Sequence, residues 1–146
     1  MKITSSAFGH DQKIPGKYTC DGDNVNPPLQ FSDVPPDSKS LVLIVDDPDA
    51  PSKTWVHWVV YNIDSDTSEV EEDTIPSGGL EATTDFGRPG YGGNCPPSGT
   101  HRYFFRLYAL DCALELPKNA TKEMVEKKMQ HHTLDKAELI GLYSGV

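Results

Sequence analysis

The sequence predicts one domain in which β-strands dominate. Three short apolar runs, at residues 41–45, 55–63 and 103–110, are rich in β-branched and aromatic residues. The 12 glycines and 12 prolines lie largely between such runs, which favours many turns over a helical bundle. At 146 residues the chain is long enough to bury one substantial core, so residues 1–146 are expected to form a single domain.

Each run has the composition and the ending of a strand. LVLIV at 41–45 is an unbroken apolar run that stops at two aspartates and a proline, which is typical of a strand covered on both faces. WVHWVVYNI at 55–63 and YFFRLYAL at 103–110 are short for helices and rich in strand-forming residues. All three are therefore predicted strands.

The segments between and after these runs predict loops and helices. Residues 64–79 are acidic and polar, as expected of a solvated loop. Residues 85–100 hold five glycines and three prolines, and a loop of this length in a compact domain is more often functional than idle. A helix is predicted over 121–129 from its apolar face, and a second short helix over roughly 134–140.

The overall charge and the cysteines limit the class of partner and the compartment. A formal charge of -9 argues against nucleic acid and against anionic lipid surfaces. No apolar stretch approaches the roughly 20 residues that cross a bilayer, and no secretory leader is recognisable, so no stable membrane insertion is expected. Three cysteines are an odd number and predict no disulfide framework. A cytoplasmic location is expected, where Cys20 and Cys95 would stay reduced.

Strand alternation aligns polar residues with an apolar row in each run. The aligned sets are Leu43, Val45 and Asp47; Trp55, His57, Val59 and Tyr61; and His101, Tyr103, Phe105 and Leu107. Because the polar members fall at strand ends, Asp47, His57, His101 and Tyr103 are expected to line the mouth of one core.

These side chains have the chemistry of an anion pocket. Two imidazoles and a phenol can donate hydrogen bonds to an oxyanion beside an apolar wall formed by Trp55, and a bound anion would raise the histidine pKa. Backbone N–H groups of the 85–100 loop could face the same anion. Asp47 would either orient a histidine or receive a ligand ammonium group.

The same residues allow other interpretations. A single histidine such as His57 on an apolar strand is most often a hydrogen-bonded core residue. Asp47, His57 and His101 could chemically hold a metal, but their spacing matches no short metal motif, so no metal or other cofactor is expected. Cys95 and Ser98 lack the sequence setting of a catalytic nucleophile. The residues therefore favour a binding pocket over an active site.

Two segments together resemble the signature regions of the phosphatidylethanolamine-binding protein (PEBP) family. They are DDPDAPSKTWVHW at 46–58 and GYGGNCPPSGTHRYFFRLYAL at 90–110. The chain is similar more narrowly to the bacterial and archaeal branch, often described as Raf kinase inhibitor-like, and the similarity extends to IPGKYTCDG, NPPL and AELIGLY. This resemblance implies an antiparallel β-sandwich with short C-terminal helices and a small anion cavity near one end.

The resemblance also implies roles for individual residues. The ligand-binding set is Asp47, Trp55, His57, Cys95, Pro96, His101 and Tyr103. The supporting set is Asp49, Pro51, Pro97 and Arg102, with a cis bond before Pro51 and, as our own hypothesis, a salt-bridge network of Arg102 with the aspartates. Departures from the family pattern are Asn94, where a proline is common, and His131, where a glycine is common at a helix end.

The expected function is therefore non-enzymatic binding or regulation. The pocket would accept a phosphate-like group, a phospholipid headgroup or a carboxylate, and the protein could inhibit a kinase or a peptidase, as the resemblance implies. The alternative is a hydrolase that uses His57 and His101 as acid and base. A homodimer is left open by the sequence.

Overall fold

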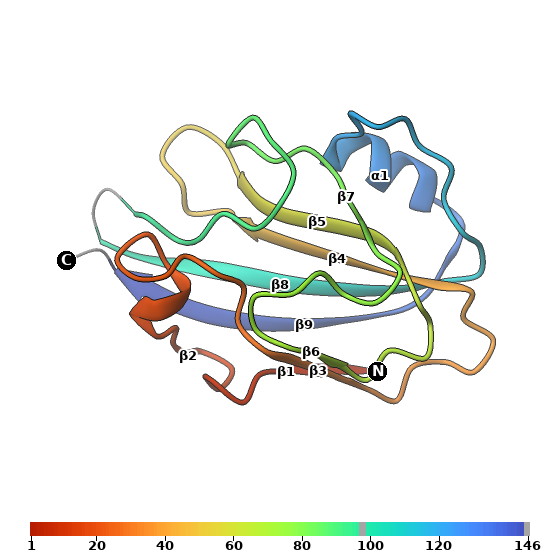
Figure 1. Ribbon diagram of the computed structural model, residues 1–146, viewed down its shortest axis with the longest axis horizontal. Helices are drawn as coiled ribbons and strands as arrows, with labels where there is room; N and C mark the ends of the chain where they lie inside the picture. Colours follow the sequence, from red (N-terminus) through yellow and green to blue (C-terminus); the bar gives the residue numbers. More distant parts are fainter. Residues whose placement is uncertain (97–98, 145–146) are drawn as a thin grey trace.

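The computed structural model describes residues 1–96 and 99–144, and its strands form two sheets (Figure 1). The six-stranded sheet has the order β2-β9-β8-β4-β5-β7 and the three-stranded sheet the order β1-β3-β6. The strands are β1 Lys2–Thr4, β2 Gln12–Lys13, β3 Leu29–Ser32, β4 Ser40–Asp47, β5 Trp55–Ile63, β6 Glu69–Val70, β7 Leu80–Glu81, β8 Thr100–Leu110 and β9 Thr133–Ser144. A 3-10 turn, η1, spans Gly16–Tyr18, and one α-helix, α1, spans Lys122–Met129. The mainly β fold is confirmed.

The three predicted strands form the centre of the larger sheet. β4 pairs antiparallel with β5 on one side and with β8 on the other. Every residue of β4 is buried, as its unbroken apolar run predicts.

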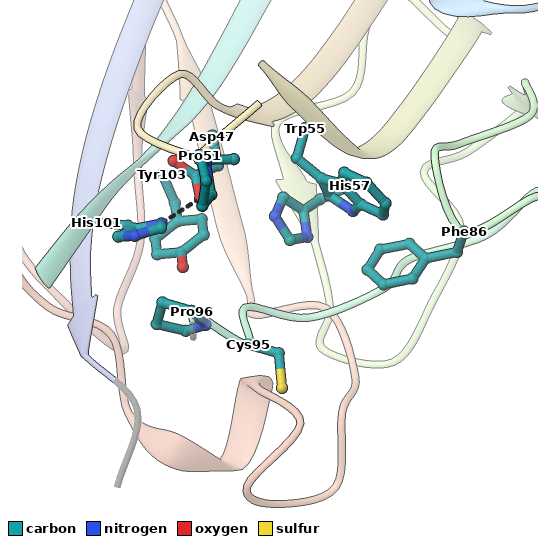
Figure 2. A pocket seen from close by; sticks show the side chains of 10 residues that line it. Asp47, Pro51, Trp55, His57, Phe86, Cys95, Pro96, His101 and Tyr103 are labelled. Atoms are coloured by element: carbon teal, nitrogen blue, oxygen red, sulfur yellow. Dashed lines mark hydrogen bonds and ion pairs between the residues drawn. The ribbon is translucent and has the colours of Figure 1, made fainter. Parts of the chain in front are cut away.

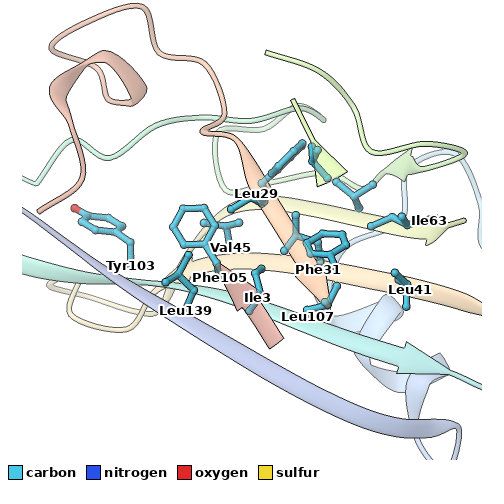
Figure 3. Packing of buried hydrophobic residues seen from close by; sticks show 14 of the residues in the cluster. Ile3, Leu29, Phe31, Leu41, Val45, Ile63, Tyr103, Phe105, Leu107 and Leu139 are labelled. Atoms are coloured by element: carbon cyan, nitrogen blue, oxygen red, sulfur yellow. The ribbon is translucent and has the colours of Figure 1, made fainter. Parts of the chain in front are cut away.

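Both faces of the larger sheet are covered. On one face, Ile3 and Phe31 of the small sheet pack with Phe105 and Leu107 of β8 (Figure 3). On the other face, Val125 of α1 belongs to a second apolar cluster that includes residues of β4 and β5. Burying a side chain such as Phe105 contributes about 1.5–3 kcal/mol relative to leaving it exposed. These two clusters fix β4, β5 and β8, the strands that carry the pocket.

The C-terminal region differs from its prediction. The helix predicted over 121–129 is present as α1, capped by Thr121, whose Oγ1 accepts a hydrogen bond from Met124 N at 3.3 Å. His131 has a φ of +68° just after this helix, the left-handed conformation that the expected glycine position implies. The prediction of a second helix over roughly 134–140 was wrong, because this segment belongs to β9.

Pairing along a long neighbouring strand explains why β9 is not helical. β9 pairs with β8 from Thr133, opposite Leu110, to Ser144, opposite Thr100. Its buried residues Leu139, Gly141 and Tyr143 recur at a period of two. No helix in the described residues is long and apolar enough to cross a membrane.

A β-bulge in β5 changes the predicted faces of that strand. Val45 pairs with Trp58 and Asp46 pairs with Val56, so His57 is an extra residue between the two pairs. The bulge bends the strand locally and changes the alternation of its side chains.

The prediction that one face of β5 carries Trp55, His57, Val59 and Tyr61 was therefore wrong. Val59 and Tyr61 pack in the cluster that contains α1, whereas His57 contacts Tyr103 of the opposite cluster. The rows predicted for the other two strands are confirmed, because their apolar members all belong to the cluster that also contains residues of the small sheet.

Candidate ligand-binding pocket

A recess of about 240 Å³ lies where the ends of β4, β5 and β8 meet two loops (Figure 2). Its lining residues are Asp47, Ala50, Pro51, Trp55, His57, Phe86, Cys95, Pro96, His101 and Tyr103. The structure thus brings together all seven residues expected to bind a ligand. Of the supporting residues, Pro51 also lines the recess, and Pro97 lies outside the described residues.

A buried Asp–His pair forms one side of the recess. The Nδ1 atom of His101 lies 2.7 Å from Oδ2 of Asp47, and both residues are buried. The carboxylate accepts the Nδ1 proton, which leaves Nε2 of His101 available to a ligand. The other oxygen, Oδ1, accepts from the backbone N–H of Asp49 at 2.8 Å. Of the two roles expected for Asp47, orienting a histidine is the one seen here.

His57 is held by a backbone carbonyl instead of a carboxylate. Its Nδ1 lies 2.7 Å from the oxygen of Gly92, and since a carbonyl can only accept, Nδ1 carries the proton. Burial lowers the pKa of His57, and the Gly92 bond and the charge of Asp47 only partly oppose this effect. In the free protein His57 is therefore a neutral imidazole at pH 7, with Nε2 available.

Tyr103 lies between the two histidines. Its ring is stacked against His101, with centroids 6.3 Å apart, and meets His57 edge-on at 5.4 Å. Burial, and then the charge of Asp47, raise the pKa of Tyr103, so its hydroxyl remains protonated and can donate. This hydroxyl points toward the side of the recess that holds Pro96 (Figure 2).

An aromatic pair forms the apolar wall. The ring of Phe86 meets that of Trp55 edge-on, with centroids 5.7 Å apart, and is tilted against that of His57, with centroids 5.6 Å apart. Phe86 is 40% exposed at the rim. Sequence reasoning missed Phe86 and Ala50. The ring lies against Gly92, where an added Cβ would be 2.3 Å from the Phe86 ring, and the sequence alone does not reveal this contact.

The predicted salt bridge of Arg102 is present beside the recess. Its Nε donates to Oδ2 of Asp49 and its Nη2 to Oδ1, each at 3.0 Å, and its backbone N–H donates to Oδ2 at 2.8 Å. These bonds hold the pKa of Asp49 below its usual value. Asp46 instead lies on the far side of β4, where Arg106 and Lys122 bind it at 3.2 and 3.3 Å. The network therefore supports the turn after β4 and does not line the recess.

The expectation of a cis bond before Pro51 was wrong. The described residues contain no cis peptide bond, so Ala50–Pro51 is trans. The turn is held instead by the Asp47–Asp49 bond and by the pairing of Asp49 with Arg102.

The expectation of reduced cysteines was also wrong. Cys20 and Cys95 form a disulfide, with an S–S distance of 2.07 Å and Cα atoms 5.5 Å apart. A parallel bridge between Thr19 and Asn94, with Cys20 N donating to Asn94 O at 3.2 Å, brings the two cysteines together. The odd count reflects Cys112, which is free. Because the cytoplasm disfavours disulfides, a cytoplasmic location stays a prediction without support from the cysteines.

A two-sheet β-sandwich with a histidine-lined recess at the end of its larger sheet defines the class of this protein. The family model described as phosphatidylethanolamine-binding protein matches residues 4–144. The chain therefore belongs to the PEBP family.

Relatives and solved structures agree with this assignment. A UPF0098 protein of Methanothermobacter thermautotrophicus is 51% identical over 148 residues, which cover 98% of each chain. The crystal structure of the PEBP homolog CT736 of Chlamydia trachomatis has a TM-score of 0.95 at 41% identity, covering 99% of this chain and 97% of that one. YbcL of Escherichia coli, described as a member of the mammalian PEBP family, has a TM-score of 0.91 at 30% identity, covering 98% and 97%.

Proposed function

We propose that this protein is a non-enzymatic binding protein whose recess accepts the anionic group of a small molecule, phosphate-like or carboxylate. The observation that carries the proposal is the convergence of His57, His101 and Tyr103 on one recess with an apolar wall. The name of the family, which refers to a phospholipid, fits a phosphate-bearing headgroup as one such ligand.

The chemistry of the three side chains suits an oxyanion. Tyr103 donates its hydroxyl, and His57 either accepts a proton from an acidic ligand oxygen or becomes protonated and donates. Hydrogen bonds to a charged group contribute about 1.5–3 kcal/mol each, more than neutral ones. Asp47 is already paired with His101, so its charge opposes an incoming anion less than a free carboxylate would.

Hydrolysis is the second candidate, because the Asp47–His101 pair has the form of an oriented general base. Cys95, the cysteine that lines the recess, is bonded to Cys20 and cannot act as a thiolate nucleophile. This observation favours binding. Esterase and phosphatase turnover that is present in the wild type and absent in His101→Ala would favour hydrolysis instead.

Inhibition of a kinase or a peptidase is the regulatory form of the proposal. Phe86 offers a partner an exposed apolar contact at the rim of the recess. Loss of inhibition in Phe86→Ala, with anion binding kept, would point to a protein partner at the rim. Loss only in His57→Ala and His101→Ala would make the ligand the regulator.

NMR of the histidine ring protons during titration with phosphate and with phosphoethanolamine tests the binding proposal. The signals of His57 and His101 should shift saturably, whereas those of His10 and His131, which lie outside the recess, should stay unchanged. The shifts should disappear in His57→Ala and His101→Ala. Unchanged His57 and His101 signals in a folded protein would refute anion binding.

A further inference from the structure

A second cluster of polar side chains lies beyond the other end of β8. Asp111 and Cys112 directly follow this strand, and His132 directly precedes β9. Ten residues of strand separate Asp111 from His101, which corresponds to about 33 Å. The cluster is therefore separate from the recess.

The three side chains converge on one point. One donor atom of each of Asp111, Cys112 and His132 lies within 4.8 Å of the other two. His132 Nδ1 lies 2.8 Å from Oδ1 of Asp111. Asp111 and His132 are exposed and Cys112 is half-buried, so the point of convergence is open to solvent.

Backbone bonds hold the two segments together without help from an ion. The β8–β9 pairing shifts register after Ala109, which lies opposite Asp135, so that Leu110 lies opposite Thr133. Asp111 N then donates to the oxygen of His132 at 3.0 Å. The donor atoms are thus brought together by the fold.

The neighbouring residues anchor the same segments. Ser40 Oγ donates to the carbonyl oxygen of Cys112 at 2.6 Å, and His132 N donates to that of Met129 at 3.0 Å. Both anchors use backbone atoms of the cluster residues, so neither anchor occupies the thiol or the imidazole, whose nearby polar partner is Asp111 of the same cluster.

We propose that Asp111, Cys112 and His132 bind a divalent transition-metal ion of the zinc class. A thiolate, an imidazole and a carboxylate are the three ligand types that zinc uses, and the thiolate disfavours Mg²⁺ and Ca²⁺. The thiol loses its proton on binding, and the two resulting negative charges balance the charge of the ion. Three protein ligands leave the fourth tetrahedral position for water.

Cobalt(II) is the most informative probe, because cobalt bound to a thiolate shows a sulfur-to-metal charge-transfer absorption. Of the three cysteines, Cys20 and Cys95 are bonded to each other, so only Cys112 can give rise to this band. The titration uses the full chain without an affinity tag or thiol reductant. We expect the band to saturate at one equivalent and to disappear when Zn²⁺ is added.

Two ligand variants and one control complete the test. Cys112→Ser should abolish the band, and His132→Gln should weaken cobalt affinity by roughly tenfold or more. His10→Gln should change neither, although His10 also sits beside a carboxylate, with Nε2 3.5 Å from Asp11. Zinc should raise the thermal unfolding midpoint of the wild type and of His10→Gln only.

Two results would overturn the proposal. One is the absence of the band in folded wild-type protein at saturating cobalt. The other is equal cobalt and zinc affinity in the wild type, Cys112→Ser and His132→Gln, each shown to be folded by circular dichroism. Because the test does not involve the recess, its result is independent of the proposed anion binding.

Discussion

The imidazole of His101 donates to the carboxylate of Asp47 across 2.7 Å, between side chains that are only 9% and 5% exposed. A pair this well buried depends on both partners, because removal of one leaves the other desolvated without its hydrogen bond. The pair therefore stabilises the end of the sheet that carries the recess.

A double-mutant cycle on this pair should show strong coupling. His101→Ala should lower the free energy of unfolding by about 3 kcal/mol, since Asp47 is left as an unpaired buried charge. Asp47→Ala combined with His101→Ala should cost clearly less than the sum of the single changes. Urea unfolding measures the free energy of unfolding of the two single variants and of the double variant. Additive effects of the two changes would contradict the coupling.

The affinity for an anion should increase as the pH falls. Burial lowers the pKa of free His57, and a bound anion favours its charged form, so binding takes up a proton. Affinity should rise as the pH falls below the pKa of His57 in the complex. It should level off below the pKa of His57 in the free protein.

Sulfate or a simple carboxylate is the appropriate ligand for this measurement, because its own charge is constant above about pH 5.5. Isothermal titration calorimetry in two buffers of different ionisation enthalpy reports the proton uptake. In His57→Ala the pH dependence should largely disappear. The same dependence of affinity on pH in the wild type and in His57→Ala would assign the proton to another group.

The stability of the free protein should also depend on His57. The unfolded histidine takes up a proton at its ordinary pKa of 6.5, whereas the folded one resists protonation until a lower pH. As the pH falls from the unfolded to the folded pKa of His57, the free energy of unfolding should therefore decrease by up to about 1.4 kcal/mol per pH unit. His57→Gln should be less sensitive to pH in urea unfolding over this window, and an equal dependence would argue against a buried neutral His57.

The disulfide should contribute strongly to stability. It joins residues 75 positions apart, and the loss of chain entropy in the unfolded state predicts about 4 kcal/mol of stabilisation. Cys20→Ser with Cys95→Ser should lower the unfolding free energy by this order. Cys112→Ser, which breaks no disulfide, is the matched control. If the double variant unfolds at the same urea concentration as the control, the bond is absent or without effect.

Local pattern was enough to predict the central strands and to place Asp47, His101 and Tyr103 at one mouth of the core, whereas Cys95 and Pro96 came from the resemblance to the family. The apolar runs of β4 and β8 have the period and length of strands, and their buried rows end at Asp47 and His101 as expected. The residues of the recess come from strand ends and from one glycine-rich loop, whose motifs are specific to the family.

The features that were missed depend on pairing between distant segments. The bulge at His57 arises from the register of β5 against β4, which no property of β5 alone determines. Residues 134–140 carry charges that also fit a helix, and only pairing with β8 makes them a strand. The disulfide requires that Thr19 and Asn94 lie side by side, which the sequence does not reveal.

The bond between Cys20 and Cys95 also makes the middle of the chain a closed covalent ring. This ring contains Asp47 and His57, whereas His101 and Tyr103 lie outside it, so the recess forms where the ring meets the C-terminal part of the chain. A single proteolytic cut inside the ring, for example in the acidic segment at 64–79 outside the short strand β6, leaves two fragments joined through sulfur. Such a nicked protein would migrate as one chain until a reductant separates the fragments.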